Sequence, residues 1–214
     1  KDAIHIQYCH TPPRFLWTEH EYVDQEAPRL IRPFVRMLMT PFRFWDKYAS
    51  AKVDHYITNS IEVQKRIKQF YGRESTIVYP YIDTKFWKPT RAKGDYFLIA
   101  GRLHAHKGGE QIVRIFNKLG LPLHVVGEGR QKEYLESIAG ENITFFGRLS
   151  DEDLRDEISG ALGYIYPQFE DFGIMPLEAA ACGTATLGLA AGGSLETIKP
   201  GSTGELFSEG TDET

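Results

Sequence analysis

Short apolar runs alternate with amphipathic segments of helical period through the second half of the chain. The runs that predict strands lie at 96–100, 123–126, 143–146, 161–166 and 184–189. The segments that predict helices lie between them, at 108–119, 131–139, 151–158 and 176–182. This alternation favours an α/β fold with a doubly wound parallel sheet. Ligands of such sheets bind beyond the carboxyl ends of the strands, so residues that directly follow a strand are candidate site residues.

The first part of the chain shows a similar pattern in shorter form. Predicted strands lie at 3–9, 53–59 and 76–79, and a predicted helix at 61–71 begins after a Ser60 cap and stops at Gly72. Residues 14–50 favour helix, and we expect interruptions at Pro28, Pro33 and Pro41. A proline-bearing segment at 80–93 is predicted as a linker. The predicted domains are therefore 1–79 and 94–214.

Charge divides unevenly along the 214 residues, whose formal net charge is −4. Residues 1–93 carry 16 Lys and Arg against 10 Asp and Glu, whereas residues 94–214 carry 9 against 19. This split favours different partners for the two halves. The mild overall acidity and the lack of a recognised motif argue against nucleic-acid binding. No run approaches the roughly 20 apolar residues of a membrane span.

The two cysteines, Cys9 and Cys182, lie among apolar or small residues without metal-ligand spacing. We interpret them as reduced core thiols, which are typical of a cytoplasmic protein.

Two carboxylates, Glu170 and Glu178, lie eight positions apart around a glycine turn and a proline that can open a helix. Pro176 suits a first helical turn, where a missing N–H costs nothing. The free amides of Phe172, Gly173, Ile174 and Met175 would then face the same space as the carboxylates. Carboxylates that bind hydroxyls, beside amides that bind phosphate, are what a sugar nucleotide requires.

Two cations, Arg102 and Lys107, follow the predicted strand at 96–100. On one loop they could neutralise a diphosphate without a metal ion. Arg102 would contact phosphate through its forked guanidinium group, and Lys107 would act as a point charge. A solvated basic loop before a helix is the alternative interpretation of the same spacing.

Together with the segments Ala179–Thr184 and Gly192–Thr197, these motifs resemble the donor-binding half of retaining glycosyltransferases of family 4, which have the GT-B fold. The resemblance is strong over 95–207 and looser over 1–90, where it points to a mannosyltransferase-like branch. It implies a Rossmann-like donor domain preceded by the C-terminal part of a second, acceptor-binding Rossmann-like domain. It also implies either a fragment cut at both ends or a naturally short chain.

The resemblance assigns roles residue by residue. Glu170 would contact the transferred sugar and Glu178 the ribose hydroxyls, while Arg102 and Lys107 would stabilise the leaving diphosphate. A histidine that contacts the donor sugar from the acceptor side corresponds to His10, which could equally be an ordinary loop histidine. The remaining residues that we expect near the nucleotide are Gly101, Gly127, Glu128, Arg148 and Leu149.

The implied reaction moves a hexose from a nucleotide diphosphate sugar to a glycan or lipid-linked acceptor, with retention of configuration and with no bound metal. GDP-mannose or a UDP-sugar would be the donor. Alternatives are a nucleotide-sugar epimerase, a non-catalytic sugar-nucleotide-binding module, and a glycosidase that uses the two glutamates as acid and nucleophile. The run Asp151-Glu152-Asp153 looks like a metal motif, but after Ser150 it is better interpreted as a helix cap.

Basic and bulky apolar residues mix over 29–47. Such a segment could lie on anionic lipid at the inner face of the membrane, or it could be a helix packed on its own domain with solvated arginines.

Overall fold

The computed structural model describes residues 3–18 and 30–208. Its contacts divide the chain into two compact units, Lys1–Pro80 and Tyr81–Thr214, and each is described by itself. Among the described residues, no helix is both long enough and apolar enough to cross a membrane.

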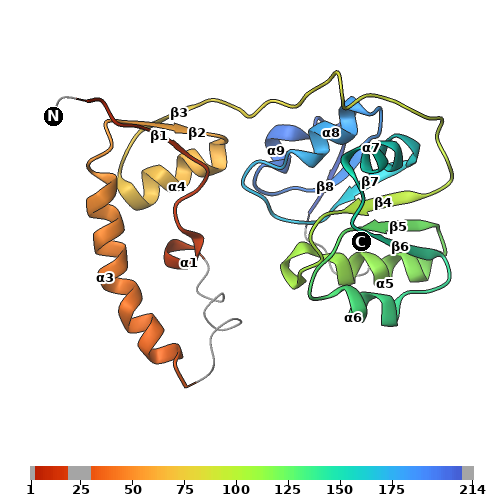
Figure 1. Ribbon diagram of the computed structural model, residues 1–214, viewed down its shortest axis with the longest axis horizontal. Helices are drawn as coiled ribbons and strands as arrows, with labels where there is room; N and C mark the ends of the chain where they lie inside the picture. Colours follow the sequence, from red (N-terminus) through yellow and green to blue (C-terminus); the bar gives the residue numbers. More distant parts are fainter. Residues whose placement is uncertain (1–2, 19–29, 209–214) are drawn as a thin grey trace. The chain divides into compact units, whose positions relative to one another are not determined.

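The first unit contains a parallel three-stranded sheet in the order β1-β2-β3 (Figure 1). Its elements are β1 (Ile6–Cys9), α1 (Arg14–Trp17), α3 (Arg32–Ser50), β2 (His55–Thr58), α4 (Ile61–Tyr71) and β3 (Ser75–Ile77). Helix α4 has the predicted bounds, because the Ser60 hydroxyl accepts from the Val63 amide at 3.1 Å and Gly72 ends the helix at φ 68°. Apolar residues of β1, β2 and α4 form a small core, in which Cys9 is a buried free thiol.

Helix α3 corrects the expectation that prolines interrupt this part of the chain. Pro33 lies in the first turn, where no intrahelical partner for its nitrogen is needed, and the helix continues through Pro41 to Ser50. Pro41 is exposed, so the carbonyl that loses its hydrogen bond faces solvent and not the core. Pro28 lies outside the described residues.

The second unit is built on a six-stranded parallel sheet in the order β6-β5-β4-β7-β8-β9 (Figure 1). Its strands are β4 (Phe97–Ala100), β5 (Leu123–Val126), β6 (Ile143–Gly147), β7 (Gly163–Tyr166), β8 (Thr186–Leu189) and β9 (Gly204–Phe207). Its helices are η1 (Ala105–Lys107), α5 (Gly109–Leu119), α6 (Lys132–Ile138), α7 (Asp151–Gly160), α8 (Met175–Ala181) and α9 (Ser194–Thr197). The predicted doubly wound parallel sheet is therefore confirmed, and β9 and α9 are additions to the prediction.

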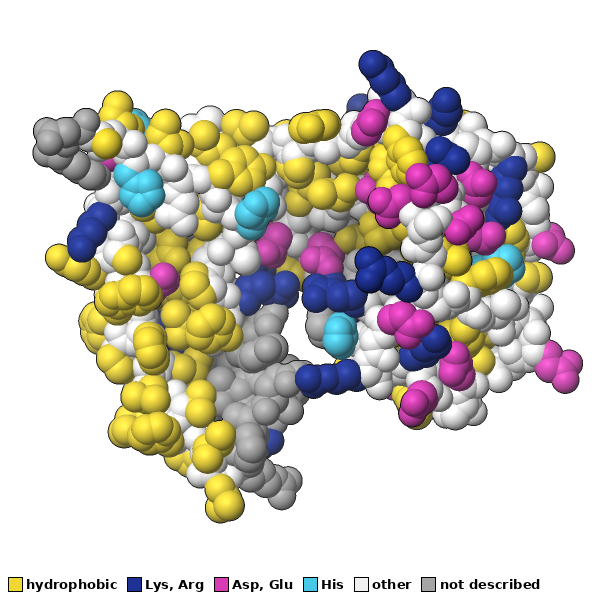
Figure 2. Space-filling model, in the orientation of Figure 1, with side chains coloured by type: hydrophobic (Ala, Val, Ile, Leu, Met, Phe, Trp, Pro, Cys, Tyr) yellow, Lys and Arg dark blue, Asp and Glu magenta, His cyan; other side chains and the backbone are white. Residues whose placement is uncertain are grey.

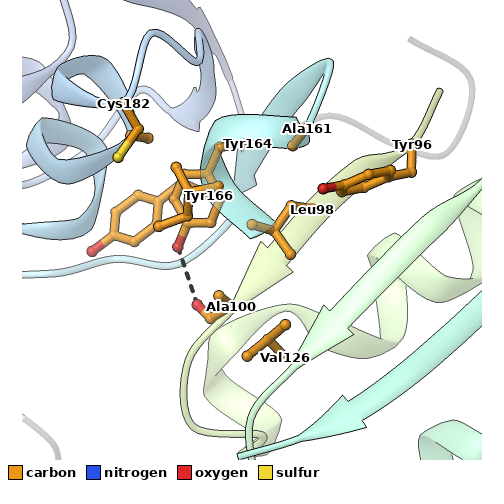
Figure 3. Close-up of a cluster of buried hydrophobic side chains, with 10 residues drawn as sticks. Tyr96, Leu98, Ala100, Val126, Ala161, Tyr164, Tyr166 and Cys182 are labelled. Carbon is orange, nitrogen blue, oxygen red and sulfur yellow. Dashed lines mark hydrogen bonds between the residues drawn. The ribbon is translucent and has the colours of Figure 1, made fainter. Parts of the chain in front are cut away.

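Both faces of this sheet are buried, as a doubly wound parallel sheet requires. Along β4, Leu98 and Ala100 belong to the cluster on one face, while Ile99 belongs to the cluster on the other. The first cluster also contains Tyr164 and the second free cysteine, Cys182 (Figure 3).

The segment predicted as a linker contributes to the second unit over much of its length. Trp87 packs against the first cluster, and the Thr90 hydroxyl donates to Asp156 of α7 at 2.8 Å. Arg91 forms an ion pair with Glu157, also of α7, at 2.8 Å. These contacts attach residues 87–91 to the second unit.

Candidate active site

The site lies where the strand order of the second sheet changes direction. β4 and β7 are neighbours, but the chain leaves β4 toward β5 and leaves β7 toward β8. At such a switch point the loops that follow the two strands diverge and leave room for a ligand. A pocket opens here between the residues after β4 and those after β7. Its lining comprises Ile99, Ala100, Gly101, Arg102, Leu103, His104, Lys107, Gly109, Ile165, Tyr166, Pro167 and Gln168.

The loop after β4 is held by the loop after β5. A Cβ atom on Gly127 would lie 1.8 Å from the Gly101 carbonyl oxygen, and one on Gly129 would lie 2.2 Å from that of Leu103. Only glycine permits this approach. The Leu103 side chain is buried, whereas Arg102 is exposed at the pocket. The two glycines thus have a packing role, which the sequence interpretation did not anticipate.

Lys107 ends η1 and is buried. Its ammonium group forms an ion pair with Glu170, which comes from the loop after β7. The two side chains are 10% and 28% exposed, so solvent screens this pair less than a surface pair. The structure therefore brings together two predicted site residues that lie 63 positions apart in the sequence.

The backbone around Glu170 is fixed by a glycine pair further along the chain. The Gly193 amide donates to the Glu170 carbonyl at 2.8 Å. Cβ atoms on Gly192 and Gly193 would lie 2.4 Å and 2.0 Å from the carbonyl oxygens of Glu170 and Phe172, respectively. The Gly192–Thr197 motif thus packs against the backbone of the loop that carries Glu170, which we call the carboxylate loop.

Helix α8 starts at Met175 with Pro176 in its first turn, close to the expected position. In the described part of the chain, the amides of Gly173, Ile174 and Met175 donate to no acceptor, as the sequence predicted for this helix start. The buried Tyr164 hydroxyl lies 3.1 Å from the Ala100 carbonyl oxygen (Figure 3). It also lies 3.3 Å from the Met175 sulfur, so it connects β4 to α8.

Glu178 lies in the first turn of α8 and is partly buried. Burial, together with the negative charge of Asp151, raises the pKa of its carboxyl group to about 7. No hydrogen bond or ion pair compensates this carboxyl group within the described residues. It is therefore a good acceptor for a ligand that brings hydroxyl donors.

The remaining predicted residues are Glu128, Arg148, Leu149 and His10, and each has different surroundings. Glu128 is exposed and pairs with Lys132 of α6 at 2.7 Å. Arg148 is exposed after β6, and Leu149 packs against the first core cluster. His10 follows β1 in the first unit, where its ring contacts that of Tyr8 edge-on at 5.1 Å, and its role toward a donor sugar stays a prediction.

The acidic run at the start of α7 caps the helix. The Ser150 hydroxyl accepts from the Asp153 amide at 3.1 Å and donates to the Asp153 carboxylate at 2.7 Å. The capping interpretation of Asp151-Glu152-Asp153 is therefore confirmed.

Several residues of the pocket were not among the predicted site residues. His104, Tyr166, Pro167 and Gln168 line the pocket beside the predicted cations. The available signal was position, because Pro167 and Gln168 directly follow the strand at 161–166 that the apolar pattern predicts.

The fold and this site define a Rossmann-like domain of the GT-B type, with a basic and acidic site at its topological switch point. The profile of the family Glycosyl transferases group 1 matches residues 82–214. The chain belongs to this family.

Two curated relatives illustrate the range of the family. A GDP-mannose-dependent alpha-mannosyltransferase of Corynebacterium glutamicum is 32% identical over 124 residues, which cover 58% of this chain and 30% of that protein. A glycogen synthase of Mycobacterium tuberculosis is 29% identical over 169 residues, which cover 71% of this chain and 41% of that protein. The chain thus spans less than half the length of these relatives.

Solved structures share the fold at low sequence identity. Sucrose-phosphate synthase from Thermosynechococcus elongatus aligns with a TM-score of 0.74 at 20% identity, covering 98% of this chain and 55% of that one. Anabaena HepE in complex with UDP aligns with a TM-score of 0.72 at 17% identity, covering 97% of this chain and 59% of that one.

Proposed function

We propose that this chain is the donor-binding part of a retaining glycosyltransferase that moves a hexose from a nucleotide diphosphate sugar to a glycan or lipid-linked acceptor. One observation carries the proposal: Lys107 and Glu170 meet at the switch point, and the exposed Arg102 borders the same pocket. Cation and carboxylate at one place match a ligand that carries both phosphates and hydroxyls.

The diphosphate is the natural partner of the two cations. In the described part of the chain, the Arg102 guanidinium has no acceptor within hydrogen-bond distance, so its forked donors are available to phosphate oxygens. Lys107 is buried, and a second anion close to it gains more than it would in water. When the bond between sugar and phosphate breaks, negative charge grows on the departing diphosphate. Fixed cations that stabilise this charge lower the barrier.

The carboxylates are the natural partners of the hydroxyl groups. A phosphate near Lys107 would compete with Glu170 for the ammonium group. The Glu170 carboxylate would then be free to accept a hydrogen bond from a sugar hydroxyl and to stabilise positive charge at the reacting carbon. Glu178 would accept from the ribose hydroxyls, which supply the partners that its carboxyl group lacks. The acceptor oxygen would then bond to the sugar carbon on the face that the diphosphate leaves, which retains the configuration, and its proton would pass to the departing phosphate.

We infer that GDP-mannose is the first donor to test. Two relatives are named as GDP-mannose-dependent mannosyltransferases. Solved neighbours hold UDP, so UDP-sugars form the second test arm.

Calorimetric titration of the chain with GDP, UDP, GDP-mannose and UDP-glucose, without and with magnesium, tests the proposal. We expect saturable binding of one nucleotide and its sugar conjugate, unchanged by magnesium, and at least a tenfold loss of affinity in Arg102→Ala. Arg114→Ala is the matched control, because Arg114 is an exposed arginine of α5 outside the pocket lining. Absence of binding by the folded chain, or equal loss in both variants, would contradict the proposal.

A further inference from the structure

Helix α3 presents its apolar residues outward. Exposed residues at positions 34, 37, 38, 41, 42, 45 and 48 recur every three or four positions, so they share one face of the helix. We call this face the apolar stripe; its members are Phe34, Met37, Leu38, Pro41, Phe42, Trp45 and Tyr48. Phe44 lies beside it and is 73% exposed. Figure 2 shows hydrophobic side chains gathered over α3.

The inner face of α3 carries the polar side chains of Arg43 and Asp46 beside the buried Met39, which forms a small apolar cluster with Leu16 of α1. The Arg43 side chain donates to the Leu16 carbonyl oxygen. The Asp46 carboxylate accepts from the Trp17 indole at 2.7 Å and from the Tyr71 hydroxyl at 2.8 Å. The helix is thus anchored to its own unit by hydrogen bonds. Helix α3 is therefore packed on its own unit, as one of the two interpretations expected, but Arg43 is not a solvated arginine as that interpretation also expected.

A contiguous apolar patch of this kind marks an interaction surface. Removing seven bulky side chains from water supplies a large driving force, at roughly 25 cal/mol for each Å² of apolar surface. Three of the seven are Phe or Trp, and Tyr48 adds a ring with a polar tip. Amphipathic rings of the Trp and Tyr type favour the boundary between lipid headgroups and acyl chains.

Charge decides between a lipid surface and a second copy of the chain. Residues 30–52 contain five Lys and Arg and one Asp, a net charge of +4. Lys47 is exposed, and the Lys52 ammonium lies 4.5 Å from the centre of the Tyr48 ring, next to the stripe. A helix is about 10 Å across, so these charges lie within about one Debye length of a surface that the stripe touches. An anionic surface attracts them, whereas two stripes face to face would repel each other.

We propose that the apolar stripe of α3 docks in the plane of an anionic bilayer surface, with its rings at the headgroup boundary and the neighbouring lysines over anionic lipid headgroups. This interaction does not depend on the donor site of the second unit.

Flotation of the chain with vesicles tests the docking. We expect binding to vesicles of phosphatidylcholine with 30% phosphatidylglycerol, weaker binding to pure phosphatidylcholine, and a loss on raising the salt concentration. Phe34→Glu combined with Phe42→Glu should reduce binding at least tenfold. Leu195→Glu is the control, because Leu195 is an exposed leucine of the second unit. Circular dichroism checks that each variant is folded.

A second measurement distinguishes docking on a lipid surface from pairing with a second copy of the chain. Light scattering coupled to gel filtration should give a monomer for the wild type and for both variants. No vesicle binding, vesicle binding that survives the double substitution, or a wild-type dimer that the double substitution dissociates would each overturn the proposal.

Discussion

The ammonium group of Lys107 forms an ion pair with the carboxylate of Glu170 across the junction of the loops that follow β4 and β7. Each side chain compensates the other in a site with little solvent. The pair therefore holds the two loops together, and under the proposed function a phosphate would replace Glu170 as the partner of Lys107 while a sugar hydroxyl would replace Lys107 as the partner of Glu170.

Removing one half of this pair should cost both stability and binding. We expect Lys107→Met to lower the free energy of unfolding by about 1–3 kcal/mol, because Glu170 is left partly buried without its cation. Donor affinity should fall at least tenfold. Urea denaturation and calorimetry measure the two effects.

The double variant Lys107→Met with Glu170→Gln separates these effects. It removes both charges, so most of the stability should return while donor binding stays lost. Lys132→Met is the control, since Lys132 pairs with Glu128 on an exposed helix surface. If the single Lys107 variant bound donor normally, the phosphate role of Lys107 would be wrong.

The raised pKa of Glu178 predicts a stability that falls as the pH rises. Folding takes up a proton between the ordinary carboxyl pKa of 4.5 and the folded value of about 7, so the contribution of this group is most favourable below pH 4.5 and is lost as the pH passes 7. Glu178→Gln removes the titration. We expect the Tm of this variant to exceed that of the wild type at pH 8 and to approach it at pH 5.

Donor binding should show the opposite pH dependence at this position. Ribose hydroxyls donate to a carboxylate better than to a carboxylic acid, so wild-type affinity should rise from pH 5.5 to pH 8. Glu178→Gln should bind donor weakly and without this rise. A variant whose affinity kept the wild-type pH profile would place the titrating group elsewhere.

Local signals explain why much of the second unit could be predicted. Its β4 to β8 and α5 to α8 lie within a few residues of the expected positions, because apolar runs and caps such as Ser150 depend on near neighbours. Candidate site residues came from the rule that loops after strands carry ligands, together with the resemblance to the glycosyltransferase family. β9 was not predicted, since its four residues include the charged Glu205.

The contacts that assemble the site depend on residues far apart in sequence. Neither the Lys107–Glu170 pair nor the packing of Gly193 against Phe172 leaves a local pattern. The direction of the apolar face of α3 stayed open for a related reason: the sequence shows that a helix is amphipathic, but not which face its own unit covers. Partners in α1 and α4 decide that orientation, among them those of Asp46 and Arg43.

A methyl group at Gly193 should displace the carboxylate loop. Its Cβ atom would lie 2.0 Å from the Phe172 carbonyl oxygen, and backbone cannot move aside as a flexible side chain can. We expect Gly193→Ala to lower Tm by several degrees and to weaken donor binding at least tenfold. Gly120→Ala is the control: it strains a helix end at φ 65°, but nothing lies within 4 Å of its Cβ atom. A Gly193 variant no less stable than this control would contradict the packing role.

Glu157 of α7 should govern how firmly residues 87–91 attach to the second unit. Its carboxylate pairs with Arg91 at 2.8 Å and with the His124 ring nitrogen at 2.9 Å. Burial acts to raise the pKa of this carboxyl group, but the bonds from His124 and Arg91 outweigh burial and lower it. The resulting stability is present above the ordinary carboxyl pKa and is lost as the pH falls through the lowered folded value.

Hydrogen exchange measures this attachment directly. We expect Glu157→Ala to lower the free energy of unfolding by about 1–3 kcal/mol and to speed amide exchange in residues 87–91, because Arg91 loses its anchor. Glu152→Ala is the matched control, because Glu152 is an exposed carboxylate of the same helix that makes no contact with residues 87–91 in the described part of the chain. Equal exchange in the two variants would show that the packing of Trp87 against the first core cluster holds this segment without the ion pair.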